Sequence, residues 1–190
     1  MSATPDEYFD SMWATGEDPW AHGRRWYEAR KYDLTVAALP AERYRSAFEP
    51  GCGAGFLSER LAGRADHLLA MERAFRGADA TRRRCAALPN VEVRRGRIPA
   101  DWPDDDFDLI VLSEVLYYLD DEELEQVLAR AGSALAAGGH VVAVHFRLEV
   151  AEHARLGDDV HEQLRAAFGP PAVAHLEPAF VLEVFGPPRR

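Results

Sequence analysis

The chain has 190 residues, of which 47% are hydrophobic and 28% charged, and its formal net charge is −10. This length and balance predict one folded domain with a sizeable core. The negative charge disfavours nucleic acid or an anionic membrane as a partner. The sequence shows no long apolar run, its start does not resemble a signal peptide, and Cys52 and Cys85 lack metal or redox spacing, so we expect a reduced, cytoplasmic setting.

Residues 1–47 are rich in aromatic side chains and differ from the rest of the chain. Their pattern predicts two helices, at about 5–14 and 25–39, with a loop containing Gly and Pro between them. We expect this segment to form a helical cap on a single domain that spans residues 1–190. Trp20 follows Pro19 in the loop and is a candidate lid over a bound ligand. Trp26 is expected to pack the cap onto the rest.

From Phe48 onward, the pattern alternates between strands and helices. The fourth and fifth predicted strands are nearly all apolar, as expected where both faces of a parallel sheet are covered. Helices are predicted from about Asp121, where acidic residues crowd the first turn, and over 158–168. The last two strands lie so close together that they should form an antiparallel hairpin. The predicted strands are 45–49, 67–71, 91–95, 107–113, 140–146, 172–176 and 180–185, with Gly138-Gly139 ending the connection before the fifth.

The segment Glu49-Pro50-Gly51-Cys52-Gly53-Ala54-Gly55 lies between the first strand and a helix. Glycines in such a turn let a ligand approach the backbone, and the helix start directs free N–H groups toward it. The second strand delivers Glu72 to its carboxyl end, where a carboxylate can accept hydrogen bonds from both hydroxyls of a ribose. A dinucleotide fold requires G-x-G-x-x-G, and Phe56 occupies the place of its third glycine. The spacing acid-x-G-x-G-x-G is instead typical of Rossmann-like methyltransferases that bind S-adenosylmethionine, with a glycine-rich turn of another α/β protein as the alternative.

Further segments give a closer resemblance. They are residues 18–20, 26–32, 101–103, 107–119, 138–140 and 143–145. With the glycine loop, they resemble the NodS family, a branch of the class I S-adenosylmethionine-dependent methyltransferases, from about residue 8 onward. The resemblance implies a mostly parallel seven-stranded sheet with helices on both faces and an antiparallel last strand. It also implies N-methylation, because family members are similar to enzymes that methylate an amino-sugar nitrogen.

The same resemblance implies the contacts to S-adenosylmethionine. The methionine part would lie on the loop formed by Gly51, Cys52, Gly53 and Gly55, and Glu72 would bind the ribose with Arg73 beside it. Glu49 would hold the loop or reach the methionine ammonium through water, and Ser113 would offer a backbone carbonyl. Arg97 stands where the superfamily usually has an acid for the adenine amino group. Arg97 cannot accept that hydrogen bond, whereas Ile98 can still supply an N–H and an apolar face. Arg30 would pair with the cofactor carboxylate or form a surface salt bridge.

The chemistry expected of such a site is an in-line displacement at a sulfonium methyl group, in which alignment supplies much of the rate. Glu114 is the first candidate to bind an amine and take its proton, with a structural or cofactor contact as the alternative. Tyr117 and His145 are further catalytic candidates, or walls of the pocket. A small-molecule acceptor is expected, with an amino sugar as the first choice and no metal. The rivals are an O-methyltransferase with His145 as base and a non-catalytic S-adenosylmethionine-binding module.

Overall fold

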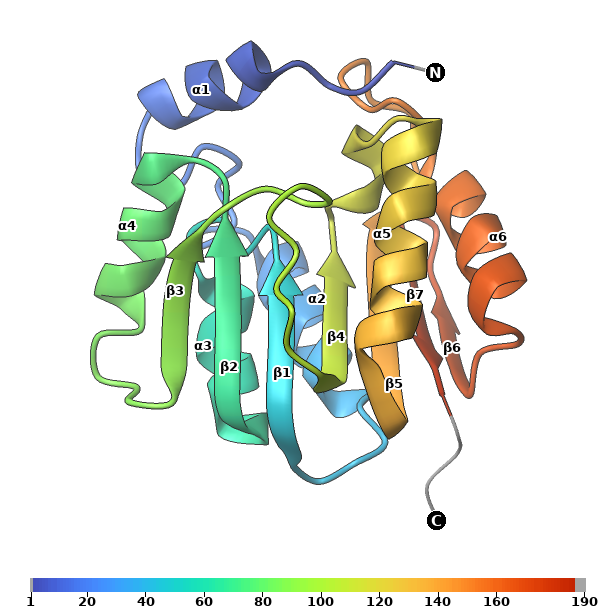
Figure 1. The fold of residues 1–190 in the computed structure, drawn as a ribbon. Coiled ribbons are helices and arrows are strands. Elements are labelled where there is room, and N and C mark those ends of the chain that lie inside the picture. The colour runs from blue at the N-terminus through green and yellow to red at the C-terminus, as the bar shows by residue number, and fades with distance from the viewer. Residues whose placement is uncertain (1, 187–190) are drawn as a thin grey trace.

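A seven-stranded sheet forms the centre of the protein, shown here as a computed structural model that describes residues 2–186 (Figure 1). The strands lie in the order β3-β2-β1-β4-β5-β7-β6. Only β7 runs antiparallel to its neighbours β5 and β6, and the remaining pairs are parallel. The strands are β1 Tyr44–Pro50, β2 Ala65–Glu72, β3 Val91–Arg95, β4 Phe107–Ser113, β5 Leu135–Phe146, β6 Val173–Leu176 and β7 Phe180–Phe185. This arrangement confirms the predicted fold class.

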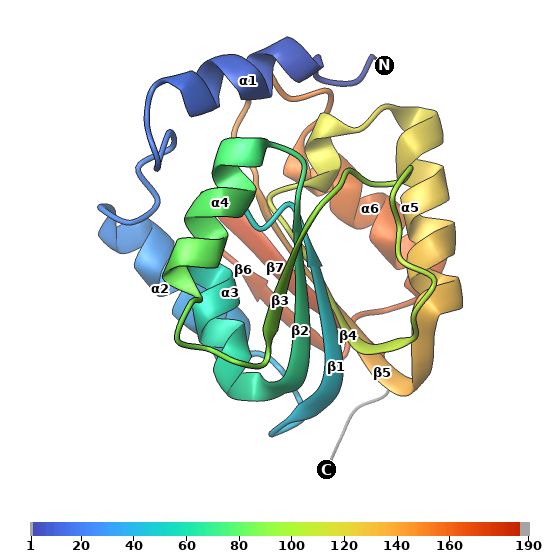
Figure 2. The ribbon, with the colours of Figure 1, turned by 60° about the vertical axis from the view of Figure 1, so that its left-hand side comes forward.

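Helices cover both faces of the sheet (Figure 2). One face carries α2 (Trp26–Ala37), α3 (Phe56–Leu61) and α4 (Phe75–Arg84), and the other carries α5 (Asp121–Ala134) and α6 (Gly157–Phe168). The helix α1 (Asp6–Ala14) lies across the carboxyl ends of the strands (Figure 1). Two short 3-10 helices, η1 (Ala62–Arg64) and η2 (Leu116–Tyr118), complete the elements. Within residues 2–186, we find no helix with the length and apolar character that a membrane crossing needs.

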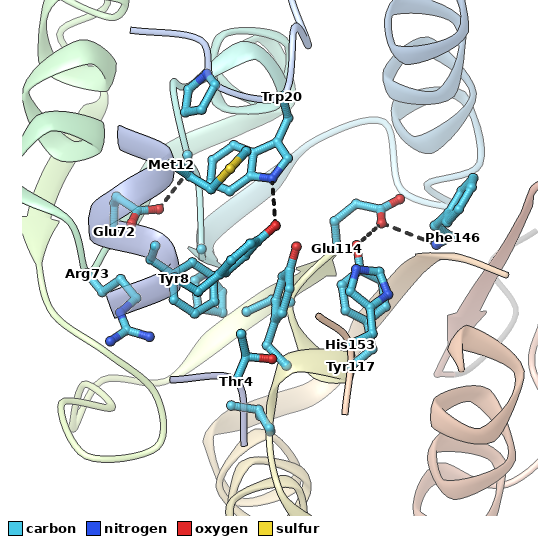
Figure 3. A pocket seen from close by; sticks show the side chains of 18 of the residues that line it. Thr4, Tyr8, Met12, Trp20, Glu72, Arg73, Glu114, Tyr117, Phe146 and His153 are labelled. Atoms are coloured by element: carbon cyan, nitrogen blue, oxygen red, sulfur yellow. Dashed lines mark hydrogen bonds between the residues drawn. The ribbon is translucent and has the colours of Figure 1, made fainter. Parts of the chain in front are cut away.

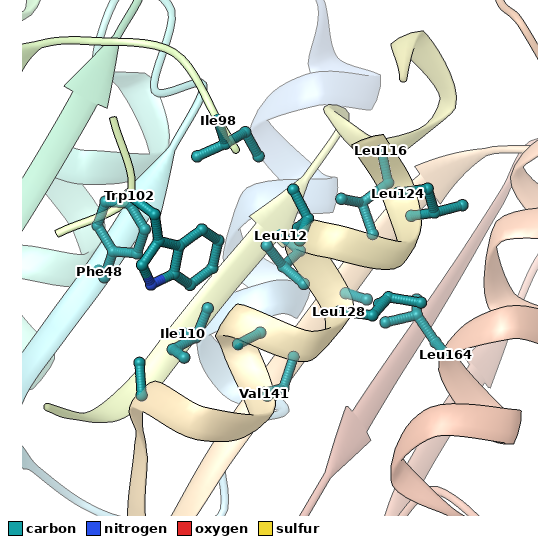
Figure 4. Packing of buried hydrophobic residues seen from close by; sticks show 14 of the residues in the cluster. Phe48, Ile98, Trp102, Ile110, Leu112, Leu116, Leu124, Leu128, Val141 and Leu164 are labelled. Carbon is teal, nitrogen blue, oxygen red and sulfur yellow. The ribbon is translucent and has the colours of Figure 1, made fainter. Parts of the chain in front are cut away.

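The core lies on both sides of β4, because alternate residues of a strand point to opposite faces. Ile110 and Leu112 pack with residues of α5 and α6, including Leu124 and Leu164 (Figure 4). Leu109 and Val111 instead join the cluster that contains residues of α2 and α3. Each buried side chain of this kind contributes roughly 1.5–3 kcal/mol to folding. The continuous apolar run seen in the sequence is therefore explained by cover on both faces.

Two local predictions were wrong. The first placed the start of β5 at residue 140, but β5 begins at Leu135, which pairs with Phe107 before the register shifts. Gly138, with φ +78°, lies within this strand and does not end the connection. The second concerned Trp26, which is 76% exposed and does not pack the cap onto the sheet. It lies off the buried stripe of α2, which consists of Glu28, Lys31, Tyr32 and Thr35.

Candidate cofactor and acceptor site

A cavity of about 850 Å³ lies between α1 and the carboxyl ends of the central strands (Figure 3). The strand order reverses here, because the chain proceeds from β1 outward to β3 and then returns to β4 on the other side of β1. Ligands of open α/β sheets bind at such switch points. The lining comes from α1, the loop after it, α2, the glycine loop, and the segments that follow β2, β3 and β4.

The glycine loop contributes to the cavity through two of its three glycines. Gly51 and Gly53 line the cavity, and a Cβ added to Gly53 would meet nothing within 4 Å. Gly55 faces the protein interior instead: its φ is +77°, and a Cβ there would lie 2.9 Å from the Thr81 side chain. The thiol of Cys52 also turns inward, 3.6 Å from Thr81 Oγ1, and burial raises its pKa well above the usual range. Gly55 and Cys52 therefore shape the loop and do not line the cavity.

Glu72 ends β2 and lines the cavity as a buried carboxylate. Its two oxygens accept backbone hydrogen bonds from Gly53 at 3.0 Å and from Ala74 at 2.9 Å. Burial raises its pKa, and these two donors act in the opposite direction. A carboxylate has about four lone-pair sites, so Glu72 keeps acceptor capacity for a hydroxyl group of a ligand. The loop thus fixes the position of the Glu72 carboxylate at the cavity wall.

Glu49 has a different environment from Glu72. It is buried beneath the loop, does not line the cavity, and accepts a hydrogen bond from Ser58 Oγ at 2.5 Å. Burial raises its pKa to about 8, against the weaker opposing effect of Ser58. This position favours the prediction that Glu49 holds the loop over the prediction that it reaches the methionine ammonium.

The far side of the cavity is lined by Arg73, Arg97 and Ile98. Asp6 of α1 forms ion pairs with both arginines, and the Arg73 guanidinium carbon lies 4.5 Å from the centre of the Phe9 ring. The hydrogen bond from Arg73 lowers the pKa of Asp6, so its carboxylate is charged at neutral pH. Arg97 also pairs with Glu123 at 3.1 Å. The positive charge at the unusual Arg97 is therefore matched by acids from α1 and α5, which sequence reasoning did not anticipate.

Glu114 lies at the opposite end of the cavity from the Glu72 side (Figure 3). It follows β4 with φ +56°, a left-handed conformation that is uncommon for a residue other than Gly. Its Oε1 accepts from Lys31 Nζ at 2.7 Å, and its Oε2 accepts from the Tyr117 hydroxyl and from the Phe146 N–H at 3.2 Å. Burial alone would raise the pKa of Glu114, but Lys31 and these donors outweigh it and hold the pKa below its usual range. Glu114 is thus a fixed carboxylate at neutral pH.

Tyr117 lines this end of the cavity, but His145 does not. His145 is fully buried on β5, where its Nε2 accepts from the Leu116 N–H at 3.3 Å and its Nδ1 lies 3.1 Å from His161 Nε2. Burial lowers its pKa well below the usual range. The structure therefore contradicts the prediction of His145 as a general base in the cavity. His153, which the sequence did not single out, lines the cavity and stacks on Tyr117 with ring centres 3.7 Å apart.

Of three other residues predicted to contact the cofactor, one lines the cavity and two do not. Trp20 lines the cavity, with its Nε1 3.5 Å from the Tyr8 hydroxyl, as a lid residue would (Figure 3). Ser113 ends β4 opposite Val144 and is not a lining residue. Arg30 is also absent from the lining and forms two hydrogen bonds to the carboxylate of Glu177, at 2.8 and 2.6 Å. This is the surface salt bridge that was the alternative for Arg30.

Sequence reasoning also missed Glu28 and Lys31, which line the cavity from α2. Lys31 Nζ lies 2.9 Å from Glu28 Oε2 and 2.7 Å from Glu114 Oε1. A signal was present, because the buried stripe of α2 consists of Glu, Lys, Tyr and Thr where a helix that only packs would carry apolar residues. Lys31 is moreover the single lysine in the chain.

The cavity fits an adenosyl sulfonium cofactor in its volume and donor set. Gly53 leaves space beside the backbone, Glu72 offers acceptor capacity, and Ile98 and Trp13 supply apolar surface. A mostly parallel sheet with one antiparallel strand and such a loop defines the class I S-adenosylmethionine-dependent methyltransferases.

Comparison with known proteins supports this class and narrows it. The methyltransferase domain family matches residues 47–139. Nodulation protein S of Rhizobium tropici is 30% identical over 128 residues, which are 66% of this chain and 54% of that protein. The chain thus spans little more than half the length of this curated relative.

Solved structures extend the comparison over more of the chain. A Pseudomonas syringae protein assigned as a methyltransferase is 38% identical, with a TM-score of 0.76 over 86% of this chain and 100% of its own. The N-methyltransferase NodS of Bradyrhizobium japonicum, in complex with S-adenosyl-L-homocysteine, shares the fold, with a TM-score of 0.82 at 22% identity over 96% of this chain and 98% of its own. The chain belongs to the methyltransferases, and its similarity to nodulation protein S and to the NodS fold agrees with the predicted family and with S-adenosylmethionine as the cofactor.

Proposed function

We propose that the protein transfers the methyl group of S-adenosylmethionine to an amine nitrogen of a small, polar, sugar-like acceptor. The observation that carries this proposal is that one cavity is lined both by the glycine loop with Glu72 and by the charged group around Glu114. The first set suits a nucleoside, and the second suits a cationic or polar acceptor. The N-methyltransferase named among the similar structures supports the choice of nitrogen.

The protein's part in this reaction is binding, alignment and proton removal. Glu72 and Gly53 hold the nucleoside, and aromatic residues such as Trp13, Trp20 and Tyr117 keep water out. The bound cofactor supplies an electrophilic methyl group. The acceptor nitrogen must lose one proton for each methyl group it gains. Burial lowers the pKa of His153, so its neutral imidazole in the cavity can accept that proton.

An assay with labelled S-adenosylmethionine tests the proposal. The acceptors are amino sugars, beginning with glucosamine, each paired with the sugar that carries a hydroxyl group in place of the amine. We expect label to be transferred to amines and not to their hydroxyl counterparts. Transfer to the hydroxyl compounds instead would establish the O-methyltransferase alternative. Binding of S-adenosylhomocysteine without transfer to any acceptor would favour the binding module.

A calorimetric measurement tests the cofactor separately. The protein should bind S-adenosylhomocysteine and show no comparable binding of NAD, because Phe56 occupies the place of the third glycine of a dinucleotide loop. A preference for NAD would overturn the proposal whatever acceptor is used.

A further inference from the structure

We propose that Glu28 binds the ammonium group of the acceptor, and that Lys31 positions Glu28 and Glu114 around this subsite. The inference rests on the proposed amine-methylating function and identifies the acceptor-binding residue within it. It differs from the expectation that Glu114 contacts the amine, which the contacts of Glu114 argue against.

The carboxylate of Glu114 is already in use. Both of its oxygens accept hydrogen bonds from the protein, one from Lys31 and the other from Tyr117 and Phe146. An acceptor could bind Glu114 only by joining or displacing these donors. Glu114 therefore fixes the wall of the cavity and the position of Lys31, and is poorly suited to receive a further cation.

Glu28 is differently placed. It lies in the first turn of α2, lines the cavity, and is 6% exposed. Within residues 2–186, the Glu28 side chain forms an ion pair with Lys31, whose Nζ lies 2.9 Å from Oε2, but this buried oxygen lacks a well-oriented hydrogen bond. A buried carboxylate with so few partners is costly unless a ligand supplies further donors. The neighbouring residue Tyr27 also lines the cavity. Its hydroxyl is buried and has no hydrogen-bond partner within residues 2–186.

The charges around Lys31 indicate the class of ligand. Two carboxylates and one ammonium leave one negative charge in a buried, largely aromatic environment. A monovalent cation would balance this charge, whereas a neutral hydroxyl or an anion would not. An alkylammonium group has several N–H donors, and both the Glu28 carboxylate and the unpartnered Tyr27 hydroxyl of the cavity lining can accept them.

Lys31 itself is suited to positioning. It is 2% exposed and contacts two carboxylates, one from its own helix and one from the segment after β4. Burial would lower its pKa, but Glu114 and Glu28 outweigh this effect and raise it, so Lys31 remains charged and does not act as a base. The chain has 22 basic residues and uses arginine for all except this one. A compact ammonium can lie between two carboxylates where a planar guanidinium requires more room.

The main test is Glu28→Gln, with Asp33→Asn as the matched control. Asp33 is an exposed acid on the same helix, paired with Arg60 away from the cavity. Glu28→Gln should raise KM for glucosamine about 10- to 100-fold, as expected for loss of a charge-assisted contact, with a much smaller change in kcat. Glu28→Asp, which retains the charge, should recover part of the loss, and Asp33→Asn should behave as wild type. Unchanged KM in Glu28→Gln would overturn the proposal.

Binding measurements separate an acceptor contact from a cofactor contact. S-adenosylmethionine carries a sulfonium charge and S-adenosylhomocysteine does not, so a residue facing the sulfonium alters the ratio of their affinities. Glu28→Gln should leave both affinities within about twofold of wild type and should weaken binding of glucosamine to the S-adenosylhomocysteine complex. Selective loss of S-adenosylmethionine affinity would assign Glu28 to the cofactor and end the proposal.

The same measurements keep this inference distinct from the function it rests on. If the wild type methylates hydroxyl groups only, the proposed function fails; the inference then fails as well if glucosamine binds no more tightly than glucose. If the wild type methylates amines and Glu28→Gln does so equally well, only the inference fails.

Lys31→Arg provides a second variant: as an imperfect substitute, it should raise KM for the amine and leave S-adenosylhomocysteine binding intact. Wild-type kinetics in Lys31→Arg would contradict the positioning role.

Discussion

Glu49 and Glu72 are buried carboxylates at the ends of adjacent parallel strands, yet their surroundings differ. Glu72 accepts two backbone hydrogen bonds and lines the cavity, whereas Glu49 accepts one hydrogen bond from Ser58 beneath the loop. The sequence analysis assigned the ribose to Glu72 and left two roles open for Glu49, either to hold the loop or to reach the methionine ammonium. That distinction depends on which carboxylate the loop covers.

Replacing Glu72 with Gln should weaken binding of S-adenosylhomocysteine on the order of tenfold or more, because ribose hydroxyls lose a charged acceptor. In the wild type, the two Glu72 oxygens accept hydrogen bonds from the N–H groups of Gly53 and Ala74. The Gln amide has only one oxygen, so its N–H₂ group would face one of these donors. Isothermal calorimetry measures the effect, with Glu92→Gln on the half-exposed surface of β3 as control. Equal affinity in both variants would show that Glu72 does not bind the ribose.

Glu49 should make folding stability fall as pH rises. Its pKa is about 8 in the folded protein and near 4.5 when unfolded, so the folded state retains a proton that the unfolded state has released between these values. Stability contributed by this proton is present below about pH 4.5 and is lost as pH rises toward 8. The Gln side chain in Glu49→Gln does not titrate. Between pH 4.5 and 8, the free energy of unfolding of this variant should therefore rise relative to that of the wild type by a few kcal/mol, as an order of magnitude. Urea unfolding at several pH values checks this, and parallel curves would contradict it.

The helix α1 meets α4 through a small contact beside the cavity. Trp13 of α1 and Glu72 both lie against Gly77 of α4, where an added Cβ would be 2.6 Å from the Trp13 ring and 2.7 Å from Glu72 Cγ. The sequence predicted the helix at about 5–14 that corresponds to α1. Its contact with α4 could not be predicted, because the sequence does not specify how two helices cross.

Gly77→Ala should therefore weaken S-adenosylhomocysteine binding on the order of tenfold by displacing Trp13 or Glu72. In an ordinary helix the same change would stabilise, since Ala has the higher helix propensity. Gly132→Ala in α5 is the matched control, as its new Cβ would meet only Phe168 at 3.7 Å. Fluorescence of bound and free protein can report the affinity; wild-type binding by Gly77→Ala would show that α1 adjusts without loss.

A buried chain of polar groups connects β5, α6 and β7 across the molecule. The Leu116 N–H donates to His145 Nε2, so the neutral ring carries its proton on Nδ1, which faces His161. His161 Nδ1 then lies 2.7 Å from Glu183, which also accepts from Arg165 at 2.8 Å. The groups are complementary only while His145 is neutral. This makes global stability sensitive to acid.

We expect the contribution of His145 to the free energy of unfolding to fall as pH drops below about 6.5, because the unfolded chain protonates His145 while burial, helped by His161, Lys31 and His153, keeps the folded pKa lower. The contribution of His145 is complete above about pH 6.5 and is lost as pH falls toward the folded pKa. His145→Gln should cost about 1–3 kcal/mol near pH 7.5 and less near pH 5. If the loss of stability in His145→Gln is the same at both pH values, a group other than His145 causes the pH dependence.

Local pattern was enough for the strand and helix succession, the antiparallel end of the sheet, the glycine turn and the acid after β2, because each follows from the spacing of neighbouring residues. The side-chain partners were not accessible in this way. Lys31 and Glu114 are 83 positions apart, and Arg30 and Glu177 are 147 apart. Which charged groups meet is decided when helices pack on the sheet and water leaves the space between them. For this reason, His145 lies in the interior and not in the cavity, and α2, predicted from the sequence to be part of a cap, contributes Glu28 and Lys31 to the cavity lining.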